Sequence, residues 1–211
     1  YPASEDCVKV CETLGLSEDF AENLVKIVFG DNYKLRQHQA EALTTSLGSP
    51  PDGKHNVVVT TGTGSGKTES FLLPLIARFM MDRKRRPLSG ELYPWWDHGC
   101  QRGANWLGVR SKLKGPKPGL KSLILYPTNA LVEDQLARFR SAALQALSIY
   151  NLPLFFFGRY TGETPGGTWN PSNSGSLRAP HVKKINEMAV SLREQSELAQ
   201  NFQEKEGAKL F

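Results

Sequence analysis

The sequence predicts an α/β domain in which helices flank a parallel sheet. Three short apolar runs, at residues 56–60, 122–126 and 152–157, lack the polar–apolar alternation of half-exposed strands. Each therefore suits a strand that is buried on both faces. Segments with helical periodicity separate the runs, and this strand–helix–strand order is typical of parallel sheets with right-handed crossovers. A glycine-rich turn follows the first run, at the edge where such sheets bind ligands.

The helices are predicted from apolar spacing and from breaks rich in glycine and proline. Two short helices are expected at about residues 4–14 and 17–29, and Ser17 suits the N-cap of the second. They form a helical N-terminal extension over residues 1–33, in front of a main domain over residues 34–211. The later helices are expected at about 36–47, 68–82, 130–148 and 182–206.

Composition narrows the class of protein. The 211 residues include 39% apolar side chains, and no run approaches the ~18 apolar residues of a membrane helix. Three cysteines without a CxxC pair argue against a disulfide framework or a zinc module. No secretory leader is visible, so we expect a cytoplasmic protein with no membrane partner.

A basic segment at residues 83–118 differs from the rest of the chain. It holds nine Lys or Arg and two acidic residues, although the whole chain has a formal charge of only +5. Such a segment attracts polyanions, but a solvated, mobile loop has the same composition. Trp95, Trp96 and Trp106 within it either stack on nucleic-acid bases or bury against the domain. We interpret the segment as an insertion into the main domain.

The strongest signal is the stretch 61–68 (TGTGSGKT), between the first strand and the long helix. Glycines let backbone N–H groups converge on phosphate oxygens, and the following helix adds the positive end of its dipole. Lys67 is expected to reach the β- and γ-phosphates of ATP, and the Thr68 hydroxyl to ligate Mg²⁺, so both have a catalytic role. The candidate nucleotide-binding residues of this loop are Thr63, Gly64, Ser65, Gly66, Lys67 and Thr68.

Other segments resemble a known family. Residues 35–43 (LRQHQAEAL) and 126–135 (YPTNALVEDQ) resemble the Q motif and motif Ia of superfamily 2 DEAD/DEAH-type helicases. Residues 159–165 (RYTGETP) resemble an element of large bacterial helicases of DNA repair or phage defence. Over roughly residues 34–165, the chain looks like the first RecA-like domain of such a helicase.

The resemblance implies roles for individual residues. Gln39 would hydrogen-bond the adenine of ATP, because an amide matches the donor and acceptor at adenine N6 and N7. By itself, Gln39 is also consistent with a polar residue on a helix face. Asn129 stands where many relatives carry a basic residue. The nucleic-acid-binding candidates, which follow predicted strands and would contact the phosphate backbone, are Pro127, Thr128, Asn129, Gly162 and Thr164.

The resemblance implies that the protein is an ATP-dependent helicase or translocase that acts on nucleic acid. We expect this nucleic acid to be single-stranded DNA rather than RNA. Its partners would be a second RecA-like domain and other subunits of a larger complex. The sequence contains no Asp-Glu-x-His or Asp-Glu-x-Asp, the acidic motif of that family. We therefore expect an incomplete domain that binds ATP·Mg²⁺ weakly and does not turn it over alone. The alternative is a nucleotide-gated scaffold subunit, in which ATP binding sets a shape and no strand is separated.

Overall fold

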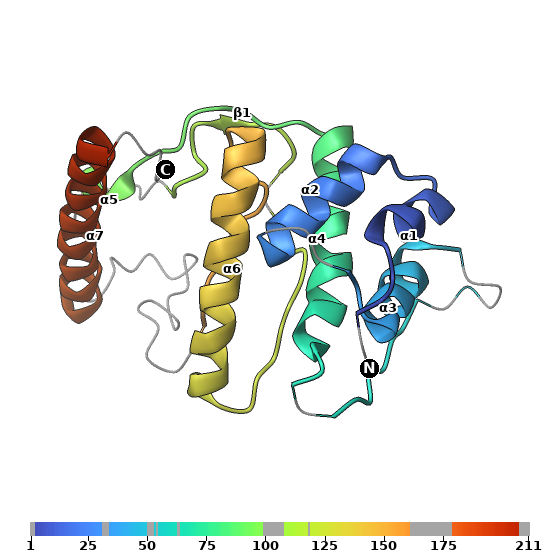
Figure 1. Cartoon of the computed structure of the whole chain (residues 1–211). Coiled ribbons are helices and arrows are strands. Elements are labelled where there is room, and N and C mark those ends of the chain that lie inside the picture. Colours follow the sequence, from blue (N-terminus) through green and yellow to red (C-terminus); the bar gives the residue numbers. More distant parts are fainter. Residues whose placement is uncertain are drawn as a thin grey trace. The chain divides into compact units, whose positions relative to one another are not determined.

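The computed structural model describes residues 3–30, 34–49, 53, 55–62, 64–98, 108–117, 119–160 and 179–206 (Figure 1). The chain divides into two compact units. The first comprises Tyr1–Pro87 and Pro118–Phe156, and the second comprises Leu88–Lys117 and Phe157–Phe211. The first unit therefore holds the glycine-rich loop and the segments that resemble the Q motif and motif Ia.

The first unit is helical. Its helices are α1 (Cys7–Thr13), α2 (Glu18–Phe29), α3 (Gln37–Leu47), α4 (Lys67–Arg85) and α6 (Asn129–Tyr150). Local capping sets where they begin. The Asp6 carboxylate accepts a hydrogen bond from the Val8 amide at 2.9 Å, and the Ser17 hydroxyl accepts one from the Phe20 amide at 3.3 Å. The predicted helices, and Ser17 as an N-cap, are confirmed.

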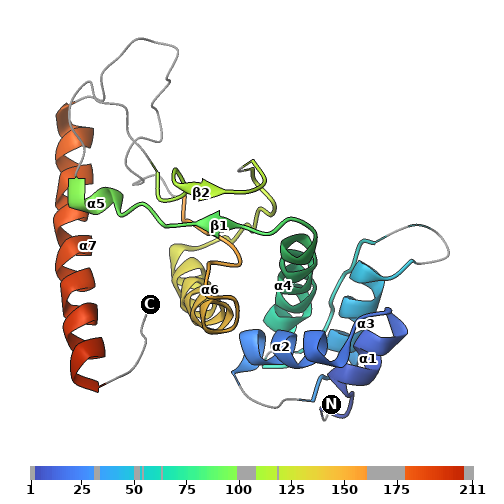
Figure 2. The same ribbon diagram turned by 90° about the horizontal axis from the view of Figure 1, so that it is seen from above.

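An apolar core joins these helices. The α3 and α4 helices lie side by side, and α2 packs against both α4 and α6 (Figure 2). The largest fully buried apolar side chains of α2, α3 and α4 are Leu24, Ile27, Leu43, Leu73 and Ile76. The Phe155 ring stacks on Phe79 of α4, with 5.3 Å between centroids, and meets Phe139 of α6 edge-on at 6.1 Å. Phe155 thereby attaches the third apolar run to α4 and α6.

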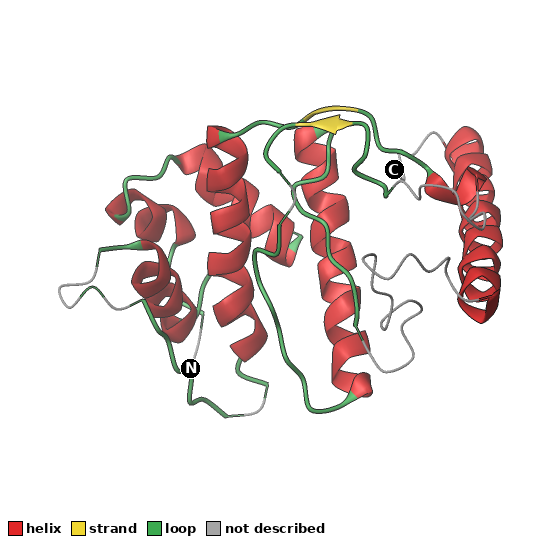
Figure 3. Cartoon of the chain, turned by 180° about the vertical axis from the view of Figure 1, so that it is seen from behind, coloured by secondary structure: helices red, strands yellow, loops and turns green. Residues whose placement is uncertain are grey.

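The parallel sheet expected from the apolar runs is not seen among the described residues. The segments 56–60, 122–126 and 155–160 run as loops (green in Figure 3), and the sheet in the described ranges is one antiparallel pair of short strands. Side chains expected inside a sheet face solvent, since Val58 is 86% exposed and Leu125 is 80% exposed. A strand forms only where neighbouring strands satisfy its backbone groups, and these described segments do not pair with one another.

The second unit contains the short antiparallel pair. Strand β1 (Ser89–Gly90) pairs with β2 (Leu113–Lys114) (Figure 2). In this register Ser89 lies opposite Lys114. Gly90 has a φ of 98°, and a Cβ there would lie 2.6 Å from the Lys112 carbonyl oxygen, so only glycine fits. Much of the basic insertion expected at residues 83–118 thus belongs to a unit separate from the nucleotide loop.

A long helix holds the tryptophan pair of the second unit. Helix α5 (Trp95–His98) packs against α7 (Ala179–Glu206). The Arg193 guanidinium of α7 donates hydrogen bonds to the carbonyl oxygens of Trp96 at 2.8 Å and Asp97 at 3.2 Å. Trp95 and Trp96 are half-buried. Of the two interpretations of these tryptophans, the contact with α7 favours burial. Trp106 lies outside the described residues.

Helix α1 carries two free thiols that face the core. Cys7 and Cys11 are buried, with 4.0 Å between their sulfur atoms. The contact with Cys11, together with burial, raises the pKa of the Cys7 thiol. The pair is a small apolar contact of the core. Among the helices of the described ranges, none is both long and apolar enough to cross a bilayer.

Replacing Phe155 with alanine tests the aromatic contact that attaches the third apolar run. The substitution Phe155→Ala removes a buried ring that touches Phe79 and Phe139, so we expect it to lower the free energy of unfolding by about 3 kcal/mol. Urea unfolding followed by circular dichroism measures this change. The control Leu144→Ala, at an exposed position of α6, should cost less than about 0.5 kcal/mol. Equal losses in the two variants would contradict the assignment of Phe155 to the core.

Candidate nucleotide-binding site

The glycine-rich loop leads directly into α4. Gly64 and Gly66 have φ angles of 74° and 79°, in the left-handed region that favours glycine, and Gly66 is the N-cap of α4. A Cβ on Gly64 would meet nothing within 4 Å, so the outer side of the loop is open. Helix α4 has 19 residues, and its unpaired amides and dipole point to this opening. The start of α4 is thus suited to bind an anion.

The Lys67 ammonium group binds two backbone carbonyls of the loop that precedes it. Its Nζ donates hydrogen bonds to the carbonyl oxygens of Thr61 at 2.6 Å and Gly62 at 3.0 Å. The hydroxyls of Thr61 and Ser65 are 2.6 Å apart and close the turn from the other side. Lys67 remains exposed, and phosphate oxygens are stronger acceptors for an ammonium than neutral carbonyls are. The side chain that the sequence predicts to bind phosphate is therefore in place and accessible.

The residues of the loop fit a nucleoside triphosphate with Mg²⁺. Thr68 is half-buried in the first turn of α4, next to Lys67. Within the described ranges, no group of three acidic, histidine or cysteine side chains is placed to hold a metal. Mg²⁺ commonly binds through substrate phosphates and one or two protein oxygens, so the Thr68 hydroxyl is a candidate for one such oxygen. Thr63 lies outside the described residues.

Gln39 has an internal role in this structure. Its side chain is 0% exposed. The amide oxygen accepts a hydrogen bond from the Arg36 amide at 2.9 Å, which is half of a capping box at the start of α3. The amide nitrogen donates to the Gly66 carbonyl oxygen at 3.1 Å. Gln39 thus ties α3 to the N-cap of α4, and a contact with adenine would require it to leave these partners.

The motif Ia segment presents a second open helix end. Thr128 is the N-cap of α6, and its hydroxyl accepts a long hydrogen bond of 3.5 Å from the Leu131 amide. Pro127, Thr128 and Asn129 are all exposed, so they are accessible to a phosphate. Burial, followed by the charge of Asp134, raises the pKa of the preceding Tyr126 hydroxyl.

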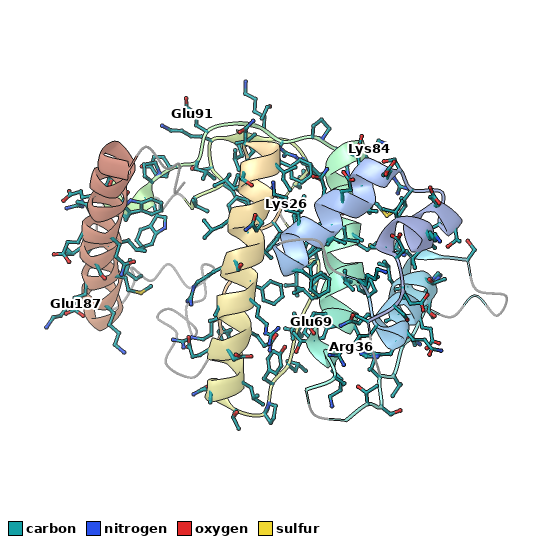
Figure 4. All side chains as sticks on the ribbon, viewed as in Figure 1. Lys26, Arg36, Glu69, Lys84, Glu91 and Glu187 are labelled. Atoms are coloured by element: carbon teal, nitrogen blue, oxygen red, sulfur yellow. The ribbon has the colours of Figure 1, made fainter. Side chains whose placement is uncertain are left out.

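An ion pair without a sequence signal joins the first turn of α4 to the middle of α6. Arg138 of α6 donates from Nη1 to a carboxylate oxygen of Glu69 at 2.5 Å, and its Nε lies 3.6 Å from a carboxylate oxygen of Asp134. Figure 4 labels Glu69 near the start of α4. The spacing of Asp134 and Arg138 is a sequence signal for an i,i+4 pair. The partnership with Glu69, 69 residues away, has no local signal.

The structure therefore brings together most of the predicted nucleotide residues. Gln39 and the residues from Gly64 to Lys67 meet at the start of α4. The start of α6 belongs to the same unit. Gly162 and Thr164, which the sequence assigns to nucleic-acid binding, lie outside the described residues.

Comparison with known proteins gives the following matches. Residues 36–154, more than half of the chain, match the DEAD/DEAH box helicase family. The Druantia protein DruE of Escherichia coli (strain UMEA 4076-1) is 37% identical over 134 residues, which is 61% of this chain and 6% of that protein. The chain thus spans a small part of this relative's length. No solved structure matches the chain.

A substitution at Gln39 separates its internal role from the adenine contact that the family resemblance implies. In Gln39→Ala, the Gly66 carbonyl and the Arg36 amide lose a buried partner, so we expect a loss of about 1–3 kcal/mol in the free energy of unfolding. Binding of ATP and GTP, measured by calorimetry, should weaken together because the loop is less fixed. Any further loss for ATP alone measures the adenine contact.

The matched control is Gln37→Ala, which removes an exposed amide that bonds Glu41 at 2.8 Å. We expect this change to cost less than about 0.5 kcal/mol and to leave both nucleotide affinities unchanged. Unaltered stability and GTP affinity in the Gln39 variant would rule out the internal role.

Proposed function

The chain belongs to the DEAD/DEAH box helicase family, and from this premise we propose that it forms the ATP-binding front part of a nucleic-acid-dependent motor, a helicase or translocase. The family implies a RecA-like fold. The observation that carries the proposal is the loop at the start of α4, where two left-handed glycines and an exposed Lys67 leave an opening for phosphates.

In this proposal the residues of the loop bind and orient ATP·Mg²⁺. The Lys67 ammonium leaves the Thr61 and Gly62 carbonyls and binds the β- and γ-phosphates, while the amides at the start of α4 bind phosphate oxygens. The Thr68 hydroxyl ligates the metal. Bound ATP supplies the phosphoryl group whose transfer drives motion. Transfer also needs an acidic group and an arginine, which we assign to other parts of the motor, so the chain alone binds without turnover.

The nucleic-acid contact is assigned to the start of α6. Pro127, Thr128 and Asn129 are exposed there, and backbone amides at a helix N-terminus bind phosphates of any sequence. Gly162 and Thr164 are proposed to extend this contact. A backbone contact suits a motor that moves along single-stranded DNA, because it does not depend on the bases. The bacterial relative supports a place among large bacterial helicases, and a role in DNA repair or phage defence remains part of the proposal.

The decisive test of ATP binding is a substitution at Lys67. In Lys67→Ala, a charge-assisted contact worth about 1.5–3 kcal/mol is lost, so the affinity for ATP·Mg²⁺ should fall about 10- to 100-fold. Binding of a fluorescent ATP analogue measures this. The control Lys34→Ala removes a lysine of similar exposure in front of α3 and should leave the affinity unchanged. An equal affinity in the two variants would refute the proposed phosphate role.

The basic end of α4 gives a test of nucleic-acid binding. Arg86 pairs with Asp82 at 3.4 Å, whereas Lys84 and Arg85 are exposed beside it (Figure 4 labels Lys84). Contacts of Lys84 and Arg85 with phosphates would make single-stranded DNA binding depend on salt. The double substitution Lys84→Ser and Arg85→Ser should then make the slope of the logarithm of the binding constant against the logarithm of the salt concentration less steep by about 1.4. Fluorescence anisotropy over a salt series measures the slope.

The matched control for this experiment neutralises two exposed lysines of α7, in Lys183→Ser and Lys184→Ser. The slope should not change in that variant. If the slope also stays constant in the α4 variant, the basic end of α4 does not contact DNA, and the start of α6 is left as the assigned contact.

A further inference from the structure

A single guanidinium joins the two helices that begin at the proposed ligand sites. Arg138 of α6 lies 2.5 Å from a carboxylate oxygen of Glu69 and 3.6 Å from one of Asp134. Glu69 is the third residue of α4, immediately after the residues assigned to phosphate and metal. Arg138 and Asp134 lie on the helix whose N-terminus is assigned to nucleic acid.

On the nucleotide side, Glu69 lies against the glycine that ends the loop. A Cβ on Gly66 would lie 3.1 Å from a Glu69 carboxylate oxygen and 2.5 Å from the Gln39 amide nitrogen. The Gly66 carbonyl also accepts a hydrogen bond from Gln39 at 3.1 Å. Gly66 is therefore enclosed by two polar side chains, and any shift of its backbone on phosphate binding moves the Glu69 carboxylate or its surroundings.

On the α6 side, the ion pair is near the segment that leads to motif Ia. The charges of Asp134 and Arg138 act in opposite directions on the pKa of Tyr126, so both groups lie near its hydroxyl. That hydroxyl is buried and has no hydrogen-bond partner among the described residues. Tyr126 directly precedes Pro127, the first residue of the proposed phosphate contact. Arg138 thus has a charged partner on α4 and a neighbour at the start of motif Ia.

One guanidinium is available to two carboxylate partners. The Arg138 guanidinium is shared between two carboxylates, and the Glu69 side chain is 15% exposed while that of Asp134 is 62% exposed. A change at Gly66 that weakens the Glu69 contact leaves Arg138 held by Asp134 alone, within α6. Coupling between two sites requires an element of this kind, whose equilibrium both sites bias.

We infer that Glu69 and Arg138 are positioning residues that couple the nucleotide loop to the nucleic-acid contact at the start of α6. This inference rests on the proposed function. Neither residue touches ATP or nucleic acid directly in this assignment. Because such coupling is reciprocal, nucleotide alters the affinity for nucleic acid by the same factor as nucleic acid alters the affinity for nucleotide.

The experiment measures this factor in the full-length protein. The dissociation constant for a fluorescent single-stranded DNA is determined without nucleotide and with a saturating non-hydrolysable ATP analogue and Mg²⁺. We expect the wild-type ratio of the two constants to differ from one by at least about fivefold, which is the lower end of typical allosteric coupling. In Glu69→Gln and in Arg138→Gln the ratio should fall to within about twofold of one. Nucleotide-free DNA binding and DNA-free analogue binding should each change less than about threefold.

Two comparisons distinguish coupling from a general structural effect. The double variant Glu69→Gln with Arg138→Gln should lose no more coupling than either single variant, because each residue acts through the other. The matched control is Asp82→Asn, which breaks the exposed ion pairs with Lys121 at 3.2 Å and with Arg86 at 3.4 Å, at the opposite end of α4. It should leave the ratio at the wild-type value.

The outcomes separate this inference from the proposed function. Failure of the wild-type protein to bind the analogue or the DNA overturns the proposed function, and the inference with it. Binding of both ligands with a wild-type ratio of one overturns the inference alone. So do a ratio that persists in the Glu69 variant, additive losses in the double variant, or an equal loss in the Asp82 control.

Discussion

The left-handed backbone at Gly66 is the constraint on which the arrangement of the first unit depends. With a φ of 79° and the Gln39 amide 2.5 Å from where a Cβ would lie, residue 66 has room only for hydrogen. Because no side chain intervenes, α3 approaches the loop closely enough for Gln39 to bond the Gly66 carbonyl. Glu69 approaches from the same helix turn and carries the connection on to α6. One residue without a side chain thus brings the three motif-bearing segments into contact.

The loop keeps its form through Lys67. Two carbonyl oxygens occupy the positions around the ammonium that the proposal gives to phosphate oxygens. The lysine is therefore solvated on its outer side and already close to the proposed anion site. In the proposed exchange of carbonyls for phosphates, the Thr61 and Gly62 carbonyls lose the ammonium, and a shift at Gly66 reaches Glu69 on the other side of the same turn.

Features that depend on neighbours in sequence were predictable, and features that depend on distant pairing were not. Helix ends followed from single side chains such as Ser17, whose cap needs only the next turn. The glycine-rich loop followed from its own composition and from the helix after it, whereas the strand predicted before it is a loop among the described residues. The apolar pattern at Val58 and Leu125 also suited strands, yet pairing needs a second segment that no local pattern specifies, and these side chains face solvent. The contact between Glu69 and Arg138 had no sequence signal for the same reason, since 69 residues separate the two. The sequence predicted Gln39 as an adenine contact, but its hydrogen bonds within the protein required the structure.

The bond from Arg193 to Trp96 spans 97 residues of chain. During synthesis the ribosome releases the tryptophan pair long before the arginine that caps it, and loop closure over such a distance is slow compared with helix formation. Trp95 and Trp96 therefore cannot pack against α7 during the time that the ribosome needs to translate the residues between them and that helix. Nascent chains are vulnerable to association through uncovered aromatic faces, so this stretch is open to that association until α7 has been made.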